Sequence, residues 1–318
     1  MDHSPNLAAT KLWADLASDP RVRVAENEIA GAKVLDFGVQ ETGSIRAGLM
    51  LAQSCMGDLG HVSITPCDES RFAVGNLVTV RTDAPLTGCL GCQYAGWPVQ
   101  SEDYFAMGSG PMRLLRGKEP VLLDLELTDV QTDSACGILE SDKLPTPSAI
   151  ESIANDCGIS AGSLTLGVAP STSLAGSIQI VARSVETAMH KLDDLEFDVR
   201  RVISAIGSAP LPPPAKKGNT IGGIGRTNDA MLYGARVTLW VDCEDESIES
   251  ILMKIPSCAS PDHGRPFEKI FADYNHDFYQ VDPSLFSPAV VVIHNLCSGR
   301  TFSAGHIVTE ILRESFGT

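Results

Sequence analysis

The sequence predicts a mixed α/β fold, because runs typical of strands alternate with runs typical of helices. The expected strands are short, rich in branched and apolar residues and bounded by Gly, Pro or Asp: residues 33–39, 121–127, 164–168, 202–206, 235–241 and 290–294. The expected helices carry apolar residues at steps of three and four: residues 7–17, 47–56, 148–155, 174–195, 247–254 and 307–315.

The length of the chain fits either two domains or one elaborate domain. With 318 residues it is long for one simple domain. We expect a discontinuous first domain of residues 1–90 plus 270–318, and a second domain of residues 91–269. Residues 210–219 contain three consecutive prolines followed by two lysines and a glycine, which predicts an exposed loop.

The charge balance excludes several classes of partner. The chain has 24 basic and 40 acidic residues, a net charge of −16, so we expect neither nucleic acid nor an anionic membrane as a partner. The most apolar short run, residues 289–293, is far below the ~18 residues of a spanning helix. The nine cysteines are an odd number in a long chain without a recognisable secretion signal, which indicates reduced thiols and a cytoplasmic location.

The segment with the most chemical potential runs from Val168 to Leu195. Pro170 and three hydroxyl residues after it are suited to a turn and a helix cap. The helix that follows carries an apolar stripe, and beside it a polar stripe of Gln179, Arg183, Glu186 and His190. Arg183 and Glu186 are spaced to form an ion pair, and a carboxylate held by a guanidinium could grip a water molecule. The pattern alone favours a solvated polar face with a surface ion pair.

Three other motifs carry weaker signals. Cys89 and Cys92 have the spacing of a metal or redox site, but no second pair exists, so we interpret them as two unrelated thiols and expect no metal. Residues 222–225 are glycine-rich but lack the full dinucleotide pattern, which favours a flexible turn. The run Gly225–Asp229 is either a loop that reads the edge of a heterocycle or an Asx-type helix cap.

Taken in order, many short pieces of the chain resemble the methenyltetrahydromethanopterin cyclohydrolase family. The match covers nearly the whole length, and so many spaced pieces are more specific than any single motif. The pieces are residues 55–57, 96–97, 104–111, 169–173, 176–179, 183–188, 227–229, 255–258, 264–267 and 282–289.

The resemblance implies two domains with a deep pocket between them, assembled as a homotrimer. It also implies hydrolysis of the cyclic amidinium of 5,10-methenyltetrahydromethanopterin to the N5-formyl form, with Arg183 and Glu186 as the catalytic pair. Tetrahydromethanopterin, or its dephospho form, would be the substrate carrier, with no prosthetic group and no metal. The substrate contacts implied are Ser173, Ser177, Gln179, Thr227, Asn228 and Asp229.

Two other functions use the same carrier. A non-catalytic tetrahydromethanopterin-binding protein would bind the carrier without converting it. A dehydrogenase would require a nicotinamide or flavin site, and the sequence offers no adequate glycine-rich fingerprint for one.

Overall fold

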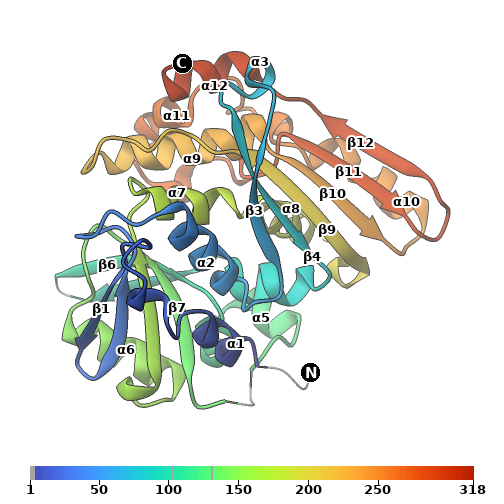
Figure 1. The fold of residues 1–318 in the computed structure, drawn as a ribbon. Coiled ribbons are helices and arrows are strands. Elements are labelled where there is room, and N and C mark those ends of the chain that lie inside the picture. The colour runs from blue at the N-terminus through green and yellow to red at the C-terminus, as the bar shows by residue number, and fades with distance from the viewer. Residues whose placement is uncertain (1–3, 102, 130–131) are drawn as a thin grey trace. The chain divides into compact units, whose positions relative to one another are not determined.

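The structure is a computed structural model that describes residues 4–101, 103–129 and 132–318. The chain divides into two compact units, the first made of residues 1–61 and 87–180, and the second of residues 62–86 and 181–318. Each unit contains a six-stranded mixed sheet with helices (Figure 1). The mixed α/β class predicted from the sequence is therefore confirmed.

The first unit is organised around a sheet in the order β1-β2-β8-β7-β6-β5. Its two central strands pair in parallel with each other, β8 is also parallel to β2, and the remaining pairings are antiparallel. The strands are β1 (Ala25–Ile29), β2 (Ala32–Asp36), β5 (Trp97–Ser101), β6 (Tyr104–Ser109), β7 (Ala135–Glu140) and β8 (Leu164–Ala169). The helices are α1 (Pro5–Leu12), α2 (Ile45–Cys55), the π-helix η2 (Leu86–Gln93), α4 (Met112–Arg116), α5 (Pro120–Asp124), α6 (Pro147–Cys157) and α7 (Leu174–Val181), with 3-10 turns η1 (Leu16–Ser18) and η3 (Ala161–Ser163).

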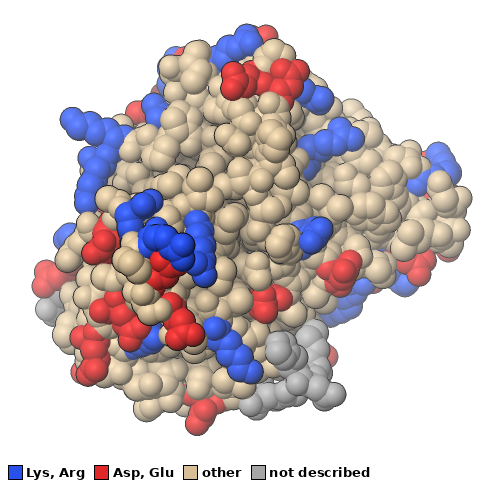
Figure 2. All heavy atoms as spheres, viewed as in Figure 1, with Lys and Arg blue, Asp and Glu red and all other residues tan. Residues whose placement is uncertain are grey.

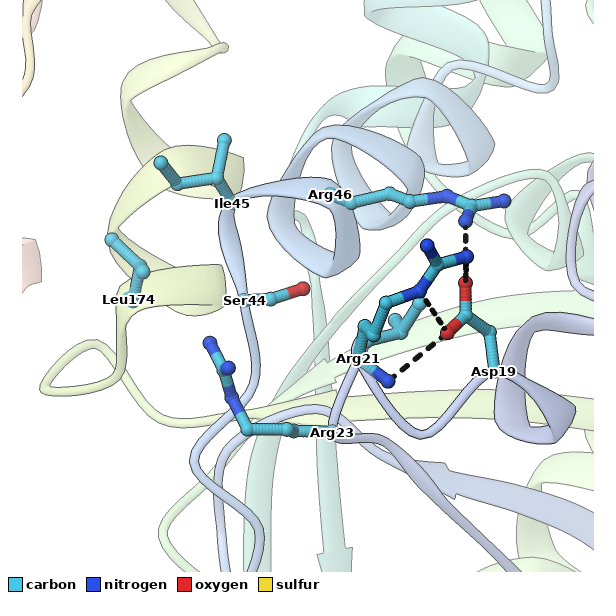
Figure 3. Close-up of a pocket in the computed structure, with 8 residues that line it drawn as sticks. Asp19, Arg21, Arg23, Ser44, Ile45, Arg46 and Leu174 are labelled. Atoms are coloured by element: carbon cyan, nitrogen blue, oxygen red, sulfur yellow. Dashed lines mark hydrogen bonds and ion pairs between the residues drawn. The ribbon is translucent and has the colours of Figure 1, made fainter.

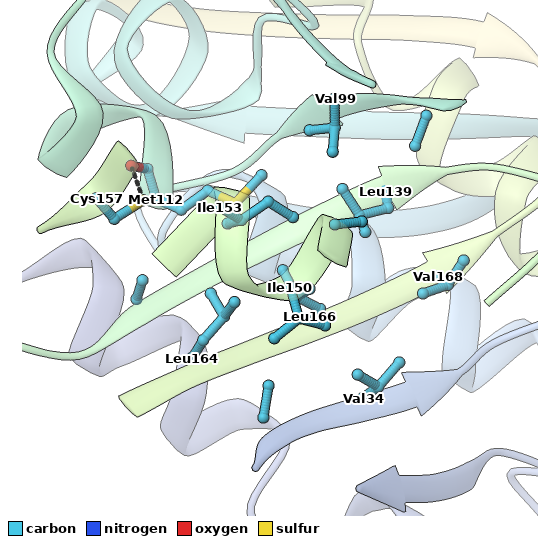
Figure 4. Packing of buried hydrophobic residues seen from close by; sticks show 14 of the residues in the cluster. Val34, Val99, Met112, Leu139, Ile150, Ile153, Cys157, Leu164, Leu166 and Val168 are labelled. Atoms are coloured by element: carbon cyan, nitrogen blue, oxygen red, sulfur yellow. Dashed lines mark hydrogen bonds between the residues drawn. The ribbon is translucent and has the colours of Figure 1, made fainter. Parts of the chain in front are cut away.

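Both faces of this sheet are covered, which explains why its central strands are apolar throughout. Successive residues of a strand point to opposite faces. Leu139 of β7 accordingly packs in one core with Ile150 and Ile153 of α6 (Figure 4). Ile138, its neighbour in β7, packs in the other core, which includes Trp13 and Leu51. The turns that leave this sheet are thus held from both sides.

The second unit has a sheet in the order β12-β11-β10-β9-β4-β3. Strand β10 is parallel to β11 and antiparallel to β9, and β4 is antiparallel to β9. The strands are β3 (His61–Pro66), β4 (Asn76–Thr82), β9 (Val202–Pro210), β10 (Arg236–Val241), β11 (Val290–Asn295) and β12 (Thr301–Gly305). The helices are α3 (Glu69–Phe72), α8 (Ser184–Asp194), α9 (Thr220–Gly234), α10 (Asp245–Glu249), α11 (Phe267–Asp273) and α12 (Thr309–Phe316), with 3-10 turns η4 (Val199–Arg201), η5 (Leu252–Lys254), η6 (Ser257–Ala259), η7 (Phe278–Gln280) and η8 (Pro283–Leu285).

One face of the second sheet packs under α8 and α9, and its other face remains partly open. On the open face, the side chain of Ile206 is 42% exposed. Trp240 lies on the same face, and the centroid of its ring is 5.4 Å from that of the His294 ring. The inner face is built from small and apolar side chains. This alternation is typical of a sheet with one covered face.

The boundaries of the units differ from the predicted domains. Residues 270–318 were expected to join the N-terminal segment, but β11 and β12 extend the second sheet through the pairing of β11 with β10. Residues 62–86 also belong to the second unit, because β4 pairs with β9. These long-range strand pairings leave no local signal in the sequence.

Several secondary-structure predictions are wrong in type or extent. The helix expected over residues 7–17 ends at Leu12 with α1, and of the helix expected over residues 247–254 only residues 247–249 belong to α10, ahead of the 3-10 turn η5. Residues 121–127 were expected to form a strand, but they follow Pro120 at the start of helix α5, a position where proline favours a helix. Residues 174–195 were expected to form one helix, but they form α7 and α8, separated by Ala182 and Arg183.

The exposed loop predicted over residues 210–219 is confirmed in part: residues 211–219 have no regular structure and residues 216–219 are exposed, but Pro210 ends β9, and Pro212 and Ala215 are buried. Within the described ranges, every helix is too short or too polar to traverse a lipid bilayer.

Candidate active site

The turn from β8 into α7 is tightly fixed around Ser173. Its hydroxyl donates to the Pro170 carbonyl and accepts from the Gly176 N–H, both at 2.9 Å, so Ser173 caps the helix as predicted. A Cβ on Gly176 would lie 2.0 Å from the Pro170 oxygen, which explains the glycine there. Gly38, in the loop after β2, is equally constrained, because a Cβ there would lie 2.4 Å from that of Ser173.

The loop that carries Gly38 is organised by a buried carboxylate that the sequence analysis did not single out. Asp36 ends β2, is 1% exposed and accepts hydrogen bonds from the backbone N–H groups of residues 38, 39, 40 and 41. An aspartate followed by a glycine at a strand end is a signal for such a turn. Asp36 therefore holds rigid the loop against which Ser173 packs.

Further along α7, Gln179 brings together segments that are far apart in the sequence. Its side-chain amide donates to the Cys55 sulfur of α2 at 3.4 Å, and that sulfur lies 3.4 Å from the Ser109 hydroxyl at the end of β6. All three side chains are buried. Three of the pieces that carry the family resemblance therefore meet here.

Arg183 and Glu186 lie at the break between α7 and α8. Arg183 is the residue before α8, and Glu186 lies in its first turn, where a carboxylate interacts favourably with the helix dipole. Arg183 is 8% exposed and Glu186 is 7% exposed. The interpretation of this stripe as a solvated polar face is therefore wrong for Gln179, Arg183 and Glu186. Their pairing with each other stays a prediction.

The apolar stripe of the same segment forms core, as predicted. Ile178, Val181, Val185, Met189 and Leu192 are all fully buried. The start of α8 approaches β9 so closely that a Cβ on Gly207 would lie 2.3 Å from the Ser184 hydroxyl and 2.9 Å from Val185. This packing fixes the first turn of α8, and with it the backbone of Glu186.

The predicted contacts Thr227, Asn228 and Asp229 lie inside α9, so the loop and cap interpretations are both wrong. The helix begins after Asn219, whose side chain caps it by accepting from the Gly222 N–H. Thr227 and Asn228 donate back to carbonyls of the preceding turn. The glycine-rich run 222–225 is the first half of this helix rather than a flexible turn.

Asp229 is fully buried and links α9 to the neighbouring helices. Its carboxylate accepts from the Phe267 N–H at 2.8 Å, the first N–H of α11. Burial raises the pKa of Asp229 to about 7, against the smaller opposing effect of hydrogen bonds from Ser315 and Phe267. One turn further along α9, the Tyr233 hydroxyl donates to the Arg265 carbonyl at 2.6 Å. Asp229 and Tyr233 thus hold residues 264–267, another piece of the resemblance.

Cys89 and Cys92 lie in the π-helix η2, and both thiols are buried. Burial raises the pKa of Cys92 far above its usual value, so the thiol stays protonated. Among residues 4–101, 103–129 and 132–318, no group of three or more His, Cys, Asp or Glu side chains is arranged to hold a metal ion. All nine cysteines lie in these ranges, and each is a free thiol.

Arg183 and Glu186 are thus a buried guanidinium and a buried carboxylate three residues apart, at the break between α7 and α8. The chain belongs to the family described as cyclohydrolase (MCH), whose model matches residues 6–316, and it is therefore an enzyme of this class.

Named relatives agree with this assignment. The chain is 62% identical over 291 residues to a methenyltetrahydromethanopterin cyclohydrolase of Rhodopirellula baltica, covering 91% of this chain and 87% of that protein. It is 42% identical over 288 residues to the enzyme of that name from Methylobacillus flagellatus, with the same two coverages. A third methenyltetrahydromethanopterin cyclohydrolase, from Methanospirillum hungatei, is 41% identical over 316 residues, and the match covers 99% of this chain and 99% of that protein.

Proposed function

We propose that this chain hydrolyses 5,10-methenyltetrahydromethanopterin reversibly to N5-formyltetrahydromethanopterin. The proposed substrate is the one for which the relatives are named, and these relatives are matched over most of their length. The observation in the structure that supports the chemistry is the burial of Glu186 and Arg183 at the break between α7 and α8. Removing a guanidinium and a carboxylate from water is costly even when they are paired, and apolar side chains would stabilise the fold as well, so their presence there supports a functional role.

In this proposal Glu186 is the general base. The substrate carbon lies between two nitrogens and shares their positive charge, so it is already electrophilic. Glu186 takes a proton from water as the oxygen attacks this carbon. One C–N bond of the adduct then breaks, and a proton ends on the departing nitrogen. The second proton of the water is released to solvent, which balances the lost charge of the substrate. General-base assistance of this kind contributes ~10²–10⁴-fold to the rate.

Arg183 would orient the Glu186 carboxylate and keep it ionised. A guanidinium near a cationic substrate is unfavourable before reaction, and this repulsion falls as the adduct loses its charge. Arg183 therefore favours the transition state over the bound substrate. Holding water and carbon in attack geometry contributes as well.

We propose that two of the six expected contact residues, Ser173 and Asn228, reach the substrate directly, since both side chains are partly exposed. The others are buried and would act by fixing the backbone around the site: Ser177, Gln179, Thr227 and Asp229. The nine free thiols support a reducing location, the cytoplasm.

The reaction is tested by the ultraviolet absorbance of the methenyl carrier mixed with purified protein. We expect the absorbance of the amidinium to fall, and we expect the same rate after dialysis against a strong chelator, because the substrate carbon needs no Lewis acid. A stable absorbance with bound carrier would instead indicate a non-catalytic binding protein. Loss of the rate on dialysis, with recovery on adding zinc, would contradict the mechanism.

We also propose that the chain is a homotrimer, as the family resemblance implies. The partly exposed apolar residues on the open face of the second sheet, Ile206 and Trp240, support an interface. Light scattering at micromolar concentration should give three times the chain mass of 33.8 kDa. Ile206→Lys should lower this mass if the open face takes part. A mass of one chain for the unaltered protein would contradict the proposal.

A further inference from the structure

The first unit contains a basic pocket that the proposed reaction does not use. This cavity has a volume of about 520 Å³, large enough for a small organic ligand. Its polar wall contains Arg21, Arg23 and Arg46 with one carboxylate, Asp19, and its apolar wall contains Ile45 and Leu174 (Figure 3).

The lining of this pocket has an excess of two positive charges, in a chain whose net charge is −16. Asp19 accepts from both Arg21 and Arg46 at 2.9 Å, and the hydrogen bonds from Arg21 contribute most to lowering its pKa to about 2. Figure 2 shows basic side chains at several places on this face, with one group of them close together among acidic side chains. The pocket is therefore positively charged although the chain as a whole is strongly negative.

Arg23 differs from the other two arginines because it has no carboxylate partner among the described residues. Its Nε donates to the Gly43 carbonyl at 2.7 Å, and the Gly43 N–H donates back to the Arg23 carbonyl at 3.1 Å. This arrangement holds Arg23 in the left-handed region, at a φ of 55°. That conformation is unfavourable for a residue with a side chain.

Gly43 is fixed in turn, since a Cβ there would lie 2.5 Å from the Phe37 carbonyl oxygen, and its φ is +64°. The two Nη groups of Arg23 extend toward Ser44 and Leu174 (Figure 3). Strained backbone is often found at binding sites, and here it orients a guanidinium that has no carboxylate partner among the described residues.

The N-terminus of α2 adds to the positive potential of the pocket. Ser44 caps this 11-residue helix by accepting from the Ala47 N–H, and Ile45 and Arg46 form its first turn at the pocket wall. The first N–H groups of a helix have no partner inside it and favour anions. The ion pairs of this cluster contribute little to the stability of the fold, because the side chains of Arg21 and Arg46 are 86% and 63% exposed.

We propose that this pocket binds an oxyanion, either a phosphate or a carboxylate group of a small organic molecule, with Arg23 as its principal ligand. Guanidinium groups present paired N–H donors that match the oxygens of both. The anion comes either from an acidic group on the carrier itself or from a separate metabolite.

The test is titration of the full-length protein with inorganic phosphate, followed by calorimetry and by phosphorus NMR. No carrier is present, so the result does not depend on the proposed reaction. We expect saturable phosphate binding, and we expect Arg23→Gln to weaken it by about tenfold or more. Arg23→Lys should recover part of the affinity, because lysine keeps the positive charge but lacks the paired N–H donors of the guanidinium. Arg46→Gln should weaken binding as well. The matched control is Arg300→Gln, an exposed arginine of the second unit, which should bind phosphate like the unaltered protein.

The source of the anion follows from kinetics with the methenyl carrier. If phosphate competes with the carrier and Arg23→Gln raises KM, the pocket takes an acidic group of the carrier. If phosphate binds without changing KM, the pocket takes a separate anion. Absence of saturable binding, or equal weakening by Arg23→Gln and Arg300→Gln in variants with normal melting curves, would overturn the proposal.

Discussion

Replacement of Glu186 by glutamine should lower kcat by roughly two to four orders of magnitude while leaving KM nearly unchanged. Glutamine keeps the shape and the hydrogen-bonding capacity of the side chain but cannot accept the proton of the attacking water. Since Glu186 is 7% exposed and lies off the apolar stripe, the neutral amide should fit its place without loss of the fold. The measurement is steady-state kinetics by absorbance, beside a thermal melt.

Glu310→Gln provides the matched control, because it makes the same chemical change at an exposed position in the first turn of α12. It should leave kcat and the melting temperature unaltered. A near-normal kcat for Glu186→Gln in a folded protein would remove Glu186 as the base. A loss of activity that accompanies a large drop in melting temperature would assign Glu186 a structural role instead.

Replacement of Asp229 by asparagine should make the protein more stable at alkaline pH relative to the unaltered chain. Burial raises the pKa of Asp229 to about 7, above the ~3.9 of an unfolded aspartate. Between these values the folded chain holds a proton that the unfolded chain has released. The stabilising effect of that proton is therefore fully present below pH ~4 and is lost as the pH rises through about 7.

Above this window the unaltered protein contains an ionised carboxylate in its interior, whereas asparagine stays neutral and can still accept from the Phe267 N–H. The difference of about three pKa units corresponds to a change on the order of 4 kcal/mol. About half of this change, roughly 2 kcal/mol, falls between pH 5.5 and pH 8.5, because the stability varies with pH only up to the folded pKa of about 7. Urea unfolding of both proteins at these two pH values measures it as the change with pH in their stability difference.

The control is Asp15→Asn, which makes the same substitution at an exposed position. If the stability difference between Asp229→Asn and the unaltered protein changed between the two pH values no more than that of the control, the pKa of Asp229 would not be raised in the folded protein. Asp229→Asn also tests the substrate contacts, because this variant should alter KM only if the Asp229 carboxylate reaches the substrate.

The elements that the sequence predicted well are those with one clear period and firm boundaries. Residues 148–155 fall within α6, because Thr146 caps the helix and Pro147 begins it. Residues 164–168 form β8, where a short run of apolar and branched residues matches a strand buried on both faces. Such elements are determined by residues close together in the sequence, so a short stretch of sequence is enough to predict them.

Other elements depend on distant packing and could not be predicted in this way. Helix α9 contains four glycines, which oppose a helix in isolation, yet Gly225 lets the helix approach Glu268 closely. The break at Ala182 and Arg183 has neither proline nor glycine to announce it. In the site, the spacing identified Gln179, Arg183 and Glu186 as one stripe, but their burial depends on neighbours that the spacing does not encode.

The pairing of β4 with β9 has a consequence for how the chain is made. Strand β4 ends at Thr82, and its partner β9 begins at Val202. At synthesis rates of about 5–20 residues per second, β4 waits on the order of ten seconds for its neighbour. During that interval the N–H and C=O groups along one edge of the strand have no permanent partner and can pair with another chain. A nascent-chain chaperone that covers residues 76–82 should therefore raise the yield of native protein more than one that acts after release.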